Sequence, residues 1–313
     1  MEENIQTGIV PTNVNYNYHI LKNNLESLQK TYPFLEIGVI GYSVLGKEIP
    51  FVKIGNGSKK ILYQGGIHAN EWITSVLLMK FIENFSRAYL TDSTIYGYDA
   101  KKLCKQVTLY IIPMMNPDGI DLVTGNVDRN SNIYKNYVSI ARNFPQIQFS
   151  TGWKANFNGV DLNLQFPAGW NEARRIKFQQ GYNRPAPRDF VGEGPLTEPE
   201  SLALYNFTIM HKFELTISYH TQGKEIYWNF QNINPPKGYE IGQRFAEVSG
   251  YTLEIVPYNS SFAGYKDWFI QDFNKPSYTV EAGFGENPLP ITQFEQIYLD
   301  NEGILVLGMV VLY

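Results

Sequence analysis

The chain has 313 residues, of which 43% are hydrophobic and 15% aromatic, enough to bury the core of one large α/β domain. The formal net charge of -4 excludes a basic field that would attract nucleic acid or an anionic membrane. Cys104 is the only cysteine, so an intramolecular disulfide is also excluded.

The two ends of the chain carry no export or membrane signal. Residues 1–13, MEENIQTGIVPTN, lack the basic and apolar regions of a secretory signal, so we expect either a cytoplasmic protein or a trimmed form of an exported one. The longest apolar run, 304–313, is far shorter than the roughly 20 residues that a membrane span needs. It predicts a last helix packed into the core and no insertion into a membrane.

The predicted elements begin with an amphipathic helix over 18–32, whose apolar face carries Ile20, Leu21, Leu25 and Leu28. Further elements are predicted along the chain. Strand patterns follow at 34–41 and 48–55, apolar runs typical of central strands at 60–66, 106–113, 213–220 and 276–283, and helices at 71–89 and 241–248.

The segment 116–199 is rich in Pro, Asn and Gly and shows no clear periodicity. Such a long irregular segment is unusual in a compact domain, and loops of this kind tend to carry function. The chain shows no repeat and no Gly/Ser linker, so we place no domain boundary within it.

The chain contains four histidines, and two of them end predicted central strands: His68 and His220. In open α/β sheets ligands bind beyond the carboxyl ends of the strands, so these two side chains are expected to face the same crevice. Glu71 lies one turn after His68. For His19 and His211 we expect ordinary structural positions.

The pattern His-x-x-Glu with a distant histidine supplies two imidazoles and one carboxylate to a metal. Three protein ligands leave the fourth position of a zinc ion open to water, which is the arrangement of a catalytic site. Since 149 residues separate Glu71 from His220, the third ligand must come from another strand.

At this point the sequence resembles the zinc carboxypeptidases of the carboxypeptidase A type, from about Tyr18 to the C-terminus. The resemblance rests on seven motifs in the family's order: YSVLGKEI, GGIHANEW, NPDG, GVDLN, EGPLTEPES, SYHTQG and SYTVEAG. It implies a single α/β domain with a central mixed sheet flanked by helices on both faces. Residues 18–313 would form the catalytic domain, and residues 1–17 an N-terminal extension.

The resemblance also implies the roles of the site residues. His68, Glu71 and His220 would bind one zinc ion per chain, and Asp161 would orient His68 from behind. Glu281 would be the general base. The residues alone support this role, because a carboxylate within an apolar strand is costly to bury and needs a function or a partner.

Three positions depart from the family pattern. Lys154 replaces the arginine that polarises the scissile carbonyl, and it keeps the charge but loses the planar fork. Asn70 replaces a substrate-facing arginine. Leu164 replaces the arginine that binds the C-terminal carboxylate of the substrate beside Asn163, and a leucine cannot bind a carboxylate.

The combination of HANEWI, DLNLQFPAGW and RPAPRDF is similar to the bacterial γ-D-glutamyl-L-diamino acid endopeptidases. These cut peptidoglycan stem peptides between γ-D-glutamate and meso-diaminopimelate, and muropeptides would be the partners of this chain.

The resemblance also implies residues that bind the substrate. Lys266 falls at the position where the family sets its preference for the substrate side chain. Tyr258, with Tyr265 as the competing candidate, resembles a mobile tyrosine that closes over the substrate. Four arginines remain open as carboxylate receptors: Arg174, Arg175, Arg184 and Arg188.

Two alternative functions stay open at this stage. One is a broad-specificity zinc carboxypeptidase that releases C-terminal residues. The other is a catalytically inactive binding module that kept the fold, although the presence of Glu281 with all three ligands disfavours it.

Overall fold

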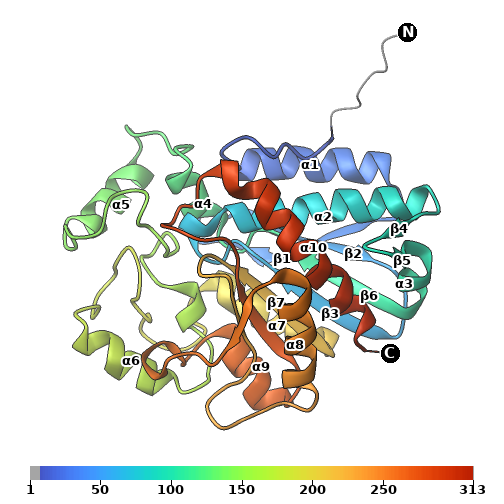
Figure 1. The fold of residues 1–313 in the computed structure, drawn as a ribbon. Coiled ribbons are helices and arrows are strands. Elements are labelled where there is room, and N and C mark those ends of the chain that lie inside the picture. Colours follow the sequence, from blue (N-terminus) through green and yellow to red (C-terminus); the bar gives the residue numbers. More distant parts are fainter. Residues whose placement is uncertain (1–7, 313) are drawn as a thin grey trace.

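An eight-stranded mixed sheet runs through the middle of the molecule (Figure 1). The structure is a computed structural model that describes residues 8–312, so residues 1–7 of the expected extension and Tyr313 lie outside the described residues. The strand order is β1-β2-β6-β3-β7-β10-β8-β9. The strands of this sheet are β1 (Glu36–Tyr42), β2 (Glu48–Ile54), β3 (Lys59–Gln64), β6 (Val107–Ile112), β7 (Leu215–His220), β8 (Glu225–Tyr227), β9 (Thr252–Glu254) and β10 (Ser277–Glu281).

The four apolar runs predicted as central strands are β6, β3, β7 and β10, which lie side by side and parallel. Every residue of β6 and β7 is buried, as expected of strands covered on both faces. The remaining strands of the sheet extend it on both sides. A separate ribbon pairs β4 (Thr94–Ile95) with β5 (Tyr98–Asp99).

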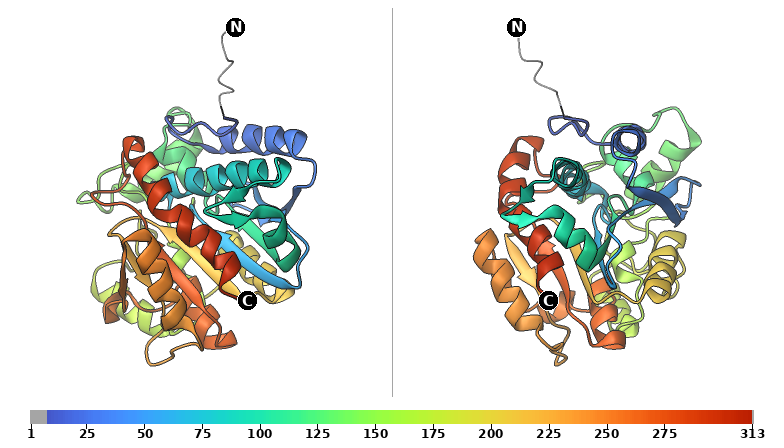
Figure 2. Two further views of the ribbon diagram at one scale, coloured as in Figure 1. Left: turned by 45° about the vertical axis from the view of Figure 1, so that its right-hand side comes forward. Right: turned by 90° about the vertical axis from the view of Figure 1, so that its right-hand side faces the viewer.

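Helices cover both faces of the sheet (Figure 2). Side chains alternate along β3, so that Ile61 and Tyr63 join the core shared with α2, α8 and α10, while Leu62 joins the core shared with α7 and α9. The predicted flanked mixed sheet is confirmed. The helices are α1 (Tyr18–Thr31), α2 (Ile73–Leu90), α3 (Ala100–Gln106), α4 (Pro117–Val123), α5 (Asn132–Ala141), α6 (Trp170–Gln179), α7 (Pro199–His211), α8 (Gly238–Ser249), α9 (Tyr265–Phe273) and α10 (Phe294–Val310).

The first and last helices confirm the sequence predictions. In α1 the Asn17 side chain caps the N-terminus by accepting a hydrogen bond from Ile20 N, and Leu21, Leu25 and Leu28 are buried. Helix α10 begins ten residues before the apolar run and packs it into the core. None of the helices within residues 8–312 is both long and apolar enough to cross a bilayer.

Residues 8–17 pack against α2. The backbone amides of Ile9 and Val10 donate to the carboxylate of Glu83 at 2.8 and 3.2 Å. Val10 and Tyr16 are buried in the core. This part of the chain therefore contributes to the body of the domain.

The segment 116–199 is more ordered than its composition indicates, because it contains α4, α5 and α6 (Figure 1). These helices are short. Side chains stabilise two of their N-termini: Asn116 accepts from Gly119 N, and Ser131 accepts from Tyr134 N. Composition hides such helices, since Asn and Ser are typical of loops as well as of caps.

Glu200, in α7, links the segment 116–199 to the turn that follows the edge strand β1 through buried hydrogen bonds. Its carboxylate accepts from Val44 N at 3.1 Å and from the Asn156 side chain at 3.2 Å, while the residue is fully buried. Burial, with a smaller contribution from nearby Asp118, outweighs the hydrogen bonds from Val44 and Asn156 and raises the pKa of Glu200 from 4.5 to about 7. Glu200 is therefore protonated in the folded protein at a pH where it is ionised in the unfolded chain.

This pKa predicts a pH dependence of stability. Between pH 4.5 and 7 the unfolded chain loses the Glu200 proton first, so the free energy of unfolding falls as the pH rises, by roughly 3 kcal/mol at most. Glu200→Gln should weaken this fall, and urea unfolding at pH 5 and 7.5 measures it. Glu193→Gln, in an exposed loop, is the control. Equal pH dependence in wild type and Glu200→Gln would contradict the assignment.

Candidate active site

A tight turn after β3 brings His68 and Glu71 together. Gly66 has φ +62, a left-handed conformation that favours glycine, and an added Cβ would lie 2.6 Å from Ser75 Oγ. A short 3₁₀ turn, η1 (Ala69–Glu71), then folds the chain back, and Glu71 N donates to His68 O at 3.1 Å. The carboxylate of Glu71 thereby comes to lie beside the His68 ring.

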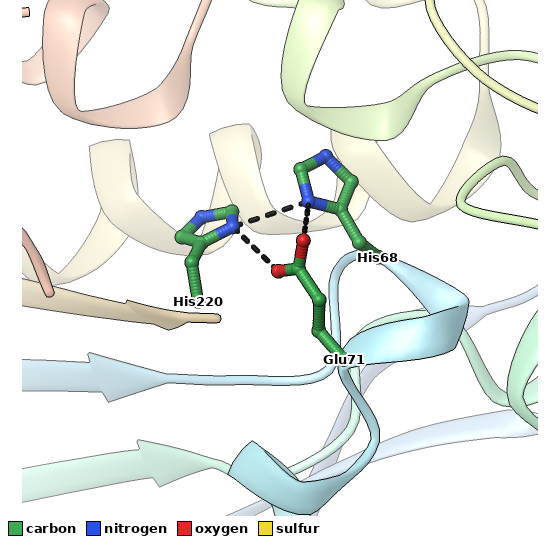
Figure 3. A group of neighbouring side chains, drawn as sticks. All are labelled: His68, Glu71 and His220. Atoms are coloured by element: carbon green, nitrogen blue, oxygen red, sulfur yellow. Dashed lines mark hydrogen bonds and ion pairs between the residues drawn. The ribbon is translucent and has the colours of Figure 1, made fainter. Parts of the chain in front are cut away.

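His68, Glu71 and His220 face one another in a buried group (Figure 3). Glu71 Oε1 lies 3.0 Å from His68 Nδ1, and its Oε2 lies 2.9 Å from His220 Nδ1. The two Nδ1 atoms are 3.2 Å apart. Two ring nitrogens and a carboxylate that converge on one point form the donor set that zinc prefers, so the residues present fit this metal.

Asp161 holds His68 from the opposite side of the ring. Its Oδ1 lies 3.0 Å from His68 Nε2 and also accepts from Asn163 N. Burial alone would raise the pKa of Asp161, but the charge and hydrogen bond of His68 and the charge of Lys154 hold it below its usual range. An ionised Asp161 accepts a hydrogen bond from His68 Nε2–H, which favours the tautomer whose Nδ1 is free to bind a metal.

Lys154 donates from Nζ to Glu71 Oε1 at 2.9 Å. Burial would lower the pKa of Lys154, but the charge of Glu71 raises it above its usual value, so the ammonium stays charged. Its position is fixed through the backbone, because Lys154 N and Ala155 N both donate to Pro187 O. The structure thus places a cation directly beside the three candidate ligands.

Glu281 is the last residue of β10 and pairs in register with His220, the last residue of β7. The strands are parallel, so both side chains reach the same end of the sheet. Burial raises the pKa of Glu281 to about 8, and the charge of Glu71 contributes to this shift. A cation held by the three candidate ligands would lower this pKa again.

His68, His220, Asp161, Lys154 and Glu281 line one cavity of about 690 Å³. Its wall comes from strand ends and from the segment 116–199, which confirms that this segment contributes to the site. His19 is exposed on α1, and His211 packs between the rings of Tyr110 and Phe207, so the structural positions expected for both are confirmed.

Comparison with known proteins agrees with this geometry. A sequence model described as zinc carboxypeptidase matches residues 21–302. The chain belongs to the zinc carboxypeptidase family. It is therefore a metallopeptidase, and the family implies zinc for the cluster of His68, Glu71 and His220.

Individual relatives fit the family assignment. γ-D-Glutamyl-L-diamino acid endopeptidase 1 of Lysinibacillus sphaericus is 45% identical over 295 residues, covering 94% of this chain and 72% of that protein. Bovine thrombin-activatable fibrinolysis inhibitor has the same fold, with a TM-score of 0.70, 18% identity and coverage of 95% and 96%. Carboxypeptidase A from Helicoverpa armigera aligns with a TM-score of 0.68, 22% identity and coverage of 95% and 74%. The expected fold class and family are confirmed.

The three positions predicted to depart from the zinc carboxypeptidase pattern all line the cavity. They are Lys154, described above, Asn70 and Leu164. Leu164 packs with Ala173, Val191 and Ala263 and presents an apolar side chain to the cavity. Asn70 is buried, and within residues 8–312 its Oδ1 has no hydrogen-bond partner. The cavity therefore lacks the guanidinium groups expected at these two positions.

The structure brings Asn163 and Lys266 into the cavity and leaves Tyr258 outside it. Lys266 is only 4% exposed, and its Nζ donates to Asn229 O at 2.6 Å and to Asp267 Oδ1 at 2.5 Å. It is not a solvated surface lysine. Asn163 Oδ1 accepts from Tyr265 N at 3.1 Å.

Tyr258 is 55% exposed, and its hydroxyl donates to Glu172 at 3.1 Å. The competing Tyr265 is fully buried and bonds to Thr208, so its ring cannot reach a substrate in this structure. The neighbours of Tyr258, Pro257 and Asn259, do line the cavity. Tyr258 therefore lies at the rim with its side chain turned away from the candidate ligands.

Sequence reasoning missed four charged residues of the cavity: Lys177, Asp189, Asp267 and Glu286. Lys177 and Asp189 belong to the irregular segment, where no periodicity indicates which side chains face inward. Asp267 follows Lys266 directly, and this adjacent pair of opposite charges in an otherwise apolar stretch was the available signal.

Proposed function

We propose that this protein is a zinc endopeptidase that hydrolyses the amide between γ-D-glutamate and meso-diaminopimelate in peptidoglycan stem peptides, with one zinc per chain. The observation that carries the proposal is the 45% identity, over 94% of the chain, to γ-D-glutamyl-L-diamino acid endopeptidase 1. Leu164 supports it, since an enzyme that requires a free C-terminal carboxylate needs a cation at this position.

The proposed roles follow from position and charge. His68, Glu71 and His220 would hold the zinc, which when bound supplies Lewis-acid activation of the attacking water and the scissile carbonyl. Glu281 accepts the proton of the water and passes it to the leaving amine. Lys154 stabilises the negative charge that develops on the carbonyl oxygen.

Lys266 and Asp267 suit the leaving residue. The side chain of diaminopimelate ends in an ammonium and a carboxylate, and this buried pair offers one charge of each sign to the cavity. A buried ion pair contributes little to stability, because desolvation offsets the attraction between the charges. A role in substrate binding explains why the protein keeps it. Asn163 is a further substrate contact, and Tyr258 becomes one if its side chain turns from Glu172 into the cavity.

The proposal predicts a substrate preference that depends on Leu164. Wild type should show a higher kcat/KM on L-Ala-γ-D-Glu-meso-diaminopimelate than on a blocked dipeptide with a free hydrophobic C-terminus. Leu164→Arg should raise kcat/KM on the dipeptide by about 10- to 100-fold, because a charge-assisted contact is worth about 1.5 to 3 kcal/mol. Steady-state kinetics on both substrates measures the change.

Leu164→Met is the matched control, since it changes the side chain but adds no charge. It should leave the activity on the dipeptide low. If wild type releases hydrophobic C-terminal residues faster than it cuts the γ-glutamyl bond, the proposal fails and the carboxypeptidase alternative replaces it.

A further inference from the structure

The structure distinguishes among the four arginines that the sequence left open as carboxylate receptors. Arg174 is exposed and stacks over the Phe178 ring at 4.6 Å. Arg175 is exposed and paired with Glu172, and Arg184 is exposed beside Asn183. Of these four, Arg188 alone lines the catalytic cavity.

Within residues 8–312, the guanidinium of Arg188 bonds to the protein through Nε alone. Nε donates to Asp189 Oδ2 at 2.7 Å, and the other oxygen of Asp189 accepts from Lys177 Nζ at 2.5 Å. Within residues 8–312 the two terminal NH₂ groups of Arg188 have no hydrogen-bond partner in the protein, and the side chain is 40% exposed. The guanidinium therefore keeps a planar fork of donors free, the geometry that binds a carboxylate through two hydrogen bonds.

The local charge also favours an anion. Asp189 is one carboxylate between two cations, so the group of Lys177, Arg188 and Asp189 carries a net positive charge. Asp189 has φ +66, a left-handed conformation that costs energy in a residue with a side chain. Its backbone amide donates to Asp161 Oδ2 at 3.2 Å. Such a strained conformation persists only where neighbouring contacts fix the backbone. Here the backbone contacts hold Arg188 at a position where it lines the cavity.

The contacts of Asp161 and Pro187 place Arg188 next to the reacting centre. Asp161 binds His68 through one oxygen and Asp189 N through the other. Pro187, the residue before Arg188, accepts from the backbone amides of Lys154 and Ala155. Arg188 therefore belongs to the wall that carries Lys154, whereas Lys266 belongs to α9, which contacts Asn163 through Tyr265 N.

A second hollow continues past Arg188. Its volume is about 700 Å³, and it shares Gly152, Lys177, Arg188 and Asp189 with the catalytic cavity. Its lining also includes the polar side chains of Gln146, Gln148 and Gln180. Arg188 thus lines both hollows.

We propose that Arg188 is an anion-binding subsite for the residue on the acyl side of the cleaved amide, with Asp189 and Lys177 as the residues that position it. The inference rests on the proposed function. When D-glutamate is joined through its γ-carboxyl, its α-carboxylate stays free beside the scissile bond, and the rest of the stem continues from its amino group. The free fork of Arg188 binds that carboxylate, and the second hollow accommodates the rest of the stem.

The test compares two substrates that differ in this carboxylate alone. The first is L-Ala-γ-D-Glu-meso-diaminopimelate, and the second carries an α-carboxamide on the D-glutamyl residue. Wild-type kcat/KM should favour the carboxylate by about 10- to 100-fold, as expected of a charge-assisted bidentate contact. In Arg188→Met this ratio should fall to near one, and in Arg188→Lys it should be intermediate, because the charge stays but the fork is lost.

Arg184→Met is the matched control, since Arg184 is exposed in the same loop and lies outside the cavity; its ratio should equal that of wild type. Zinc content of each variant shows that the site is intact. A wild-type ratio in Arg188→Met, or the absence of a preference in wild type, would overturn the inference while γ-amide cleavage still supports the proposed function. If wild type cuts neither substrate at the γ-amide, the proposed function itself fails.

Discussion

His220→Ala should remove both the metal and the activity of this enzyme. Purified wild type should contain about one zinc per chain, and the variant close to none. The physical reason is the size of the ligand set, because a site reduced from three protein ligands to two rarely retains zinc. His68→Ala should behave in the same way, since both rings offer Nδ1 to the same point. Metal analysis after gel filtration measures the result.

His19→Ala provides the control for this prediction. His19 is exposed on α1 and, among the residues that the structure describes, its side chain bonds only to Asn23, so its replacement should leave zinc content and activity at the wild-type level. Undiminished zinc in both His68→Ala and His220→Ala would mean that other residues bind the metal.

Glu281→Gln should leave the zinc site intact and reduce kcat by about a hundredfold or more, the range usual for loss of a general base. Glutamine has nearly the same shape as glutamate, but its amide cannot accept the proton of the attacking water. The side chain sits beside His220 in the register of two parallel strands, so the replacement should not disturb the sheet. Steady-state kinetics on the γ-glutamyl substrate, with zinc content measured in parallel, separates the loss of chemistry from the loss of metal.

Glu254→Gln is the matched variant, because Glu254 is an exposed carboxylate on β9 of the same sheet and lies outside the cavity. It should retain wild-type activity. A wild-type kcat in Glu281→Gln would transfer the role of the base to another group, of which the cavity offers Glu286 as the nearest alternative by chemical type.

The parts of the fold that sequence predicts well are those that burial controls. The runs that became β3, β6, β7 and β10 are apolar along their length because both faces are covered, and this pattern is visible without a structure. The same logic placed His220 at the end of β7, which the structure confirms. It also placed His68 at a strand end, but β3 ends at Gln64 and His68 lies on the turn before η1. The two Nδ1 atoms are nevertheless 3.2 Å apart.

The polar side of the cavity could not be predicted in the same way. Arg188 and its exposed neighbour Arg184 have the same residue type in the same loop, and the hydrogen bond from Asp189 N to Asp161, 28 residues away, helps to decide which of them faces inward. Lys266 shows the same limit, because only the packing of α9 determines that this lysine is buried and donates to Asn229 O, 37 residues away. Hydrogen bonds of this kind join residues far apart in the sequence and leave no periodic signal.

Mass spectrometry of the products formed from a muropeptide with the stem L-Ala-γ-D-Glu-meso-diaminopimelate-D-Ala tests the proposed cleavage of the γ-D-glutamyl amide most directly. The zinc-loaded enzyme should release the dipeptide meso-diaminopimelate-D-Ala and leave a fragment that ends in D-glutamate, because on the proposed function the apolar Leu164 does not bind a free carboxylate on the residue after the cut. Release of free D-alanine, with the γ-glutamyl bond left intact, would contradict the account and identify the enzyme as a carboxypeptidase.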